Sequence, residues 1–131
     1  MPPQRFDEQA LRVHRRVSGG VETVSLAGEL DLGSADVLAA IAGEASDAGL
    51  LFDLSNLEFL DPAGIRGLLA AGTRARRTGR GLAIVCPPES AAFRTLRLTR
   101  MLGKLLIYRD CDLAREALTG RRPRRDRRRA P

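Results

Sequence analysis

The chain has few of the residue types on which enzyme chemistry and metal binding usually depend. Among its 131 residues there is no tryptophan, and there are two cysteines and a single histidine, His14. One histidine excludes most catalytic triads and histidine metal sites, and Cys86 and Cys111 do not have metal-ligand spacing. We therefore expect no enzymatic activity, no cofactor and no metal, with both cysteines reduced and behaving as small apolar side chains.

Long apolar runs are also missing. No stretch of about 18 apolar residues occurs, so the sequence predicts no membrane-spanning helix. The amino terminus has no apolar segment of the kind found in secretory signals, which favours a cytoplasmic location. Aromatic residues make up 4% of the chain and hydrophobic residues 44%, so the core should consist mainly of aliphatic side chains.

Positive charge is concentrated at the carboxyl terminus. The net charge is +6, and residues 121–131 account for all of it with seven arginines and one aspartate. The body is thus neutral, which argues against a nucleic-acid-binding fold, where the positive patch lies on the domain. We expect a disordered tail over 120–131, in which the arginines from Arg121 to Arg129 make at most a weak contact with nucleic acid.

The pattern of apolar residues predicts strands that alternate with helices, after an amino-terminal extension over 1–9. Strands are predicted at 10–17, 21–27, 50–54, 82–86 and 105–108, and helices at 34–49 (capped by Ser34), 62–78, from Ser90 and from Asp110 or Asp112. The first two strands flank a Ser-Gly-Gly turn and should pair as an antiparallel hairpin. The remaining alternation implies right-handed crossovers. The predicted fold is therefore a single α/β domain over 10–119, with about four helices and a mixed, mostly parallel sheet of about five strands.

Residues 53–65 are the most informative segment, because they predict a strand, a short loop and a helix that begins at a capped turn. Asp61 suits the N-cap position and Pro62 suits the first helical position. Such a helix start presents free backbone N–H groups and a partial positive charge. Since parallel strands end at one edge of a sheet, Glu29 and Asp31 after the second strand should lie beside Asp61.

Three blocks occur in order along the chain: residues 24–31, which end in Gly-Glu-Leu-Asp; residues 53–65; and residues 82–108, which contain Arg-Thr-Leu-Arg-Leu-Thr. Together these blocks resemble the STAS domain of bacterial anti-sigma factor antagonists, over about residues 10–119. The resemblance implies a STAS fold and a role in transcription regulation. It also implies a partner, a serine-kinase-type anti-sigma factor, whose binding releases a sigma factor.

The chain departs from the resembled family at one hydroxyl. In the family, the second Ser or Thr of an Asp-Ser-Ser/Thr-Gly loop is phosphorylated by the kinase, and phosphorylation breaks the complex. Here Pro62 and Ala63 replace the two hydroxyl residues, and Arg66 adds bulk and charge nearby. The resemblance thus implies partner contacts without a phosphorylation switch, through Asp31, Ser55, Asp61, Pro62, Ala63, Gly64 and Arg66.

Other interpretations stay open on the sequence alone. The chain could bind its anti-sigma factor constitutively, bind a different partner through the same surface, or serve as a scaffold that has lost switching. A further class is a ligand-sensing module, in which the start of the helix at Pro62 holds a nucleotide or another anion.

Overall fold

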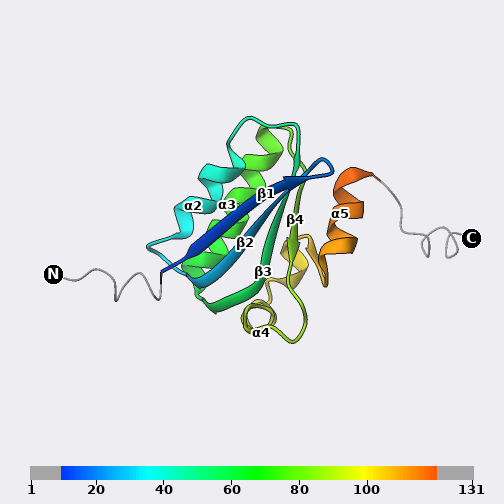
Figure 1. The fold of residues 1–131 in the computed structure, drawn as a ribbon. Coiled ribbons are helices and arrows are strands. Elements are labelled where there is room, and N and C mark those ends of the chain that lie inside the picture. Colours follow the sequence, from blue (N-terminus) through cyan, green and yellow to red (C-terminus); the bar gives the residue numbers. More distant parts are fainter. Residues whose placement is uncertain (1–9, 121–131) are drawn as a thin grey trace, which may run out of the picture.

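The computed structural model describes residues 10–120, which form one five-stranded sheet with helices on both faces (Figure 1). The strands, in their spatial order, are β1 (Arg12–Ser18), β2 (Val21–Leu30), β3 (Gly49–Leu60), β4 (Leu82–Val85) and β5 (Ile107–Tyr108). The helices are α2 (Ala35–Ala42), α3 (Pro62–Arg77), α4 (Ala91–Leu98) and α5 (Cys111–Thr119), with a 3-10 turn, η1 (Leu102–Lys104).

The sheet has the predicted topology. β1 and β2 are antiparallel, and β2, β3, β4 and β5 pair in parallel. The α/β class, the edge hairpin and the mostly parallel sheet are therefore confirmed. The predicted extension over 1–9 and the tail from residue 121 lie outside the described residues.

The sheet buries an apolar layer on each face. Val24, Leu26 and Phe52 point to the face covered by α2, α3 and α4, where Leu68 and Leu96 pack against them. The other face of the sheet packs against α5. The strand residues on this face that cluster with Ala114 of α5 are Val21, Leu51, Ala83 and Val85. Successive residues of a strand face opposite sides of the sheet, so central strands covered on both faces are apolar throughout.

Two elements differ from their predicted lengths. α2 ends at Ala42 instead of reaching Gly49, because Gly43 caps it and the following Ala45 is exposed. β3 does not end at residue 54 but continues to Leu60, with two irregularities in its pairing with β2. These bulges give β3 two residues more than β2, so its inward residues no longer follow strict alternation.

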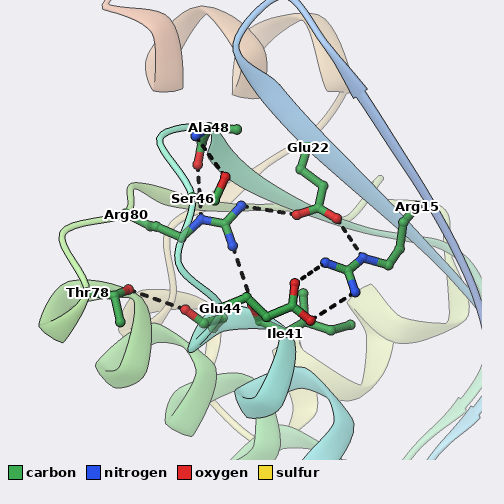
Figure 2. A network of polar contacts seen from close by, with 9 residues as sticks. Arg15, Glu22, Ile41, Glu44, Ser46, Ala48, Thr78 and Arg80 are labelled. Carbon is green, nitrogen blue, oxygen red and sulfur yellow. Dashed lines mark hydrogen bonds and ion pairs between the residues drawn. The ribbon is translucent and has the colours of Figure 1, made fainter.

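A buried arginine joins the amino ends of the parallel strands to the end of α2 (Figure 2). Arg80 precedes β4 and is only 4% exposed. Its guanidinium donates to the backbone oxygens of Ala48 at 3.0 Å and Ile41 at 3.4 Å. It also donates to Glu22 Oε1 at 3.1 Å, which pairs a buried cation with a buried carboxylate.

Glu22 extends this network to β1. Its Oε2 accepts from Arg15 Nε at 2.6 Å, and Arg15 also forms an ion pair with Glu44 after α2 (Figure 2). The hydrogen bond from Arg15, assisted by that from Arg80, lowers the pKa of Glu22 although burial opposes the shift. The two carboxylates likewise raise the pKa of Arg15. Arg15 and Glu22 thus stabilise each other's charged forms.

Candidate docking site at the carboxyl ends of β2 and β3

α3 begins as predicted. Asp61 Oδ1 accepts a hydrogen bond from Gly64 N at 2.8 Å, and Pro62 occupies the first turn of the helix. Asp61 N lies 3.4 Å from the Leu30 carbonyl oxygen, to which it donates. The start of α3 is therefore fixed by its own cap and by the end of the neighbouring strand.

Asp31 lies next to this helix start, also as predicted. Leu30 pairs with Leu60 in the parallel register, so the residues that follow, Asp31 and Asp61, leave the sheet side by side. Asp31 Oδ1 accepts from Gly33 N at 3.0 Å and from Ser34 Oγ at 3.2 Å. Ser34 was expected to cap α2, but its hydroxyl closes the turn and makes no cap hydrogen bond. Asp31 thus has a structural role in shaping this edge.

Two of the predicted contact residues lie beneath the helix start. Ala63 is 9% exposed, and Gly64 is buried. A Cβ on Gly64 would lie 2.3 Å from the Leu30 carbonyl oxygen, so only glycine allows α3 to approach β2 this closely. The close packing against β2 explains why residue 64 is a glycine, with no need for a binding partner. Burial also leaves Ala63 with little surface for contact with a partner. Pro62 and Arg66, in contrast, are exposed.

Ser55 does not join the turn, which corrects its predicted placement. The expected loop after residue 54 is part of β3, so Ser55 lies five residues before the strand end, about 16 Å along the strand. Its hydroxyl donates to Asp53 Oδ1 at 2.6 Å, and Cys111 Sγ lies 3.7 Å from the other oxygen of that carboxylate. Ser55 therefore belongs to the face of the sheet that α5 covers in part.

Two apolar side chains that sequence reasoning missed complete the exposed edge. Leu32 follows Asp31 and is 78% exposed, and Phe59 is 47% exposed. Phe59 pairs with Glu29 in the register of β2 and β3. Phe59 points away from the core because Leu60 points into it and neighbouring residues of a strand face opposite sides. No local signal in the sequence indicates this direction, since the segment after residue 54 is predicted as a loop.

The charges around these side chains are mainly negative. We define the docking end as eight residues at the carboxyl ends of β2 and β3 and in the first turns of α3: Glu29, Asp31, Leu32, Glu58, Phe59, Asp61, Pro62 and Arg66. Within residues 10–120, none of its four carboxylates forms an ion pair. An anion approaching the start of α3 would meet these carboxylates, and the Gly64 N–H already donates to Asp61. The geometry therefore disfavours the nucleotide or anion site considered from the sequence.

The described part of the chain holds no cluster of three or more side chains that could bind a metal ion. Over the same residues, no helix combines the length and apolar character needed to span a membrane. Both cysteines are free thiols, with Cys86 buried. Burial and the nearby Asp53 carboxylate raise the pKa of the Cys111 thiol to about 11, which keeps it protonated at neutral pH.

The family described as "Mlab, STAS domain" matches residues 13–108. The chain therefore belongs to the STAS domain family, as its three sequence blocks predicted. No curated protein matches it in sequence.

Solved structures share this fold at low sequence identity. An anti-sigma factor antagonist from Mycobacterium paratuberculosis superposes with a TM-score of 0.70 at 23% identity, over 85% of this chain and 96% of that one. The antagonist SpoIIAA in its unphosphorylated form gives 0.63 at 14% identity, over 87% of this chain and all of that one (100%). The murine anion transporter Slc26a9 gives 0.55 at 15% identity, over 86% of this chain but 19% of the transporter. At such identities the likeness shows the fold.

Proposed function

We propose that this protein is an anti-sigma factor antagonist that binds a kinase-type anti-sigma factor through the docking end. The observation that carries the proposal is the exposure of Leu32 and Phe59 beside the capped start of α3. Structures of similar fold that are named anti-sigma factor antagonists support the choice of partner.

The composition of the docking end fits a protein interface. Large apolar side chains at the centre of an interface lose water on binding, while charged residues at the rim set orientation and partner choice. Leu32 and Phe59 supply the apolar part, and the four carboxylates, which form no ion pair within the described residues, supply the rim. The partner surface should consequently be basic and apolar, and association should slow as salt increases.

We further propose that phosphorylation does not switch this interaction. A phosphate adds nearly two negative charges, and beside the carboxylates of the docking end it would disrupt this surface by like-charge repulsion and desolvation. Ala63, at the position that resembles the family's acceptor, carries no hydroxyl that a kinase could modify. The charge of the docking end is then constant, and the concentration of the partner determines how much complex forms.

The test is a direct binding measurement between the full chain and purified kinase-type anti-sigma factors, with and without MgATP. We expect the same Kd in both conditions and no phosphate on this chain by mass spectrometry. Leu32→Asp should weaken binding by about thirtyfold or more, as expected for a central interface residue. Leu98→Asp changes an equally exposed leucine on α4 and serves as the matched control.

The outcomes separate the remaining interpretations. Failure to bind any kinase-type anti-sigma factor would contradict the proposed partner and favour a different one. Stoichiometric phosphate on this chain would contradict the proposed absence of a switch. Equal binding by Leu32→Asp and the unchanged chain would exclude the docking end.

A second variant tests only the proposal that the partner is a kinase. Ala63→Ser restores a hydroxyl with the smallest possible change in volume. We expect the partner to phosphorylate this variant in the presence of MgATP and the complex then to dissociate. A stable complex with no phosphorylation of Ala63→Ser would contradict the expectation that the partner phosphorylates a hydroxyl at position 63.

A further inference from the structure

An apolar hollow lies between α3 and the segment that connects α4 to β5. Its volume is about 500 Å³, within the usual range of small-molecule sites. The walls are aliphatic: Leu69, Leu82, Leu105 and Leu106 line it, and its floor reaches the fully buried Leu68 and Ile84.

Gly72 keeps the hollow open. It lies in the middle of α3, where glycine destabilises a helix by roughly half to one kcal/mol relative to alanine. Neither strain nor crowding requires it, because its φ is not positive and a Cβ would meet its nearest atom at 3.8 Å. That nearest atom is Leu82 Cδ2, followed by Arg76 Nη1, and both residues line the hollow. A side chain at this position would therefore project into the space.

Cations mark the opening of the hollow. Arg76 and Lys104 line it and are exposed, and none of its lining residues is acidic. Neither side chain forms an ion pair within residues 10–120. Lys104 belongs to residues 90–109, which hold five basic side chains and no acidic one. Charge therefore favours a ligand with a negative head group.

We propose that the hollow binds an amphipathic anion, with its alkyl chain against the leucines and its head group beside Arg76 and Lys104. This site is separate from the docking end, because it faces the carboxyl-terminal half of α3, about 15 Å along the helix from Pro62. It does not depend on the proposed anti-sigma factor.

The test is calorimetric titration of the full chain with octanoate, decanoate and dodecanoate, each below its critical micelle concentration. Burial of the chain should lower Kd roughly three- to fourfold for each methylene added, until the hollow is full. Decan-1-ol, which lacks the charge, should bind about five- to tenfold more weakly than decanoate at low salt.

Two pairs of variants locate the binding site. Gly72→Leu fills the hollow and should abolish decanoate binding while leaving the unfolding midpoint equal or higher, because leucine is the better helix former. Ala70→Leu adds a similar side chain on the exposed side of α3 and should bind as before. Lys104→Glu should weaken decanoate about tenfold but not decan-1-ol, whereas Arg97→Glu on α4 should change neither.

Three results would overturn the proposal. These are the absence of saturable binding by any of the three carboxylates, an affinity that does not depend on chain length, and unchanged binding by a folded Gly72→Leu variant.

Discussion

The two ends of the parallel sheet use charge in opposite ways. At the amino ends of the strands, Arg80, Glu22, Arg15 and Glu44 form all three ion pairs found within residues 10–120. At the carboxyl ends, the four carboxylates of the docking end have no such partner in that part of the chain. Paired charges, of which Arg80 and Glu22 are buried, hold elements together, whereas charges that have no ion-pair partner within residues 10–120 and lie near exposed apolar side chains are available to a binding partner. The comparison thus separates the end that secures the fold from the end that is available for binding.

The strongest test of this comparison removes the buried cation. Arg80→Ala should lower the free energy of unfolding by about 3 to 5 kcal/mol, because it leaves the buried Glu22 with one partner and removes the donors to the Ala48 and Ile41 carbonyl oxygens. Urea unfolding followed by circular dichroism measures the loss. Arg77→Ala, at the exposed end of α3, is the control and should stay within about 0.5 kcal/mol of the original chain. A loss below about 1 kcal/mol for Arg80→Ala would show that water replaces the network.

The second test asks whether a buried residue next to the docking end has a structural role. Gly64→Ala should cost about 1 to 3 kcal/mol, since its Cβ would lie 2.3 Å from the Leu30 carbonyl oxygen and 2.9 Å from Leu60 Cδ1. Gly72→Ala, a glycine of the same helix with space for a Cβ, should instead stabilise the chain by up to about 1 kcal/mol. Thermal or urea unfolding distinguishes the two signs. Equal effects would contradict the role assigned to Gly64.

The order of elements could be predicted from the sequence because the signals are local. The Asp61-Pro62 cap, the glycine turn before β2 and the apolar runs of β3 and β4 each act within a few residues. The proximity of Asp31 and Asp61 then followed from the rule that parallel strands end at a common edge. The full length of β3 could not be predicted, because its bulges place Leu54, Leu57 and Leu60 in one core layer at intervals of three. Such spacing breaks the alternation from which strands are predicted.

The error in β3 explains the errors in the site. A loop beginning at Ser55 would have brought that serine to the helix start, and the continuous strand takes it away. The same strand turns Phe59 outward, a direction that depends on the number of residues bulged before it. The exposure of Leu32 depends on what packs around the turn, which no local pattern records. Side chains placed by backbone capping were predictable, whereas those placed by register were not.

A third test uses pH and acts on the amino end alone. The hydrogen bond from Arg15, followed by that from Arg80, lowers the pKa of Glu22 in the folded chain, while an unfolded glutamate titrates near about pH 4.3. Its contribution to stability should therefore be complete above that pH and be lost as pH falls through the lower folded value. Glu22→Gln should flatten the decline of unfolding free energy below about pH 4.3. An unchanged decline would mean that other carboxylates dominate acid unfolding.

The smallest expected effect on stability is the one that most sharpens the contrast between the two ends. Glu58→Lys replaces an exposed acid of the docking end and should change the free energy of unfolding by no more than about 0.5 kcal/mol. Because it reduces the negative rim, it should nevertheless slow association with the partner and make the rate less sensitive to salt. Asp47→Lys, an exposed acid in the loop before β3 at the opposite end, should leave both unchanged. If the two variants bind alike, net charge and not the location of the carboxylates governs association, and the docking end is not where the partner lies.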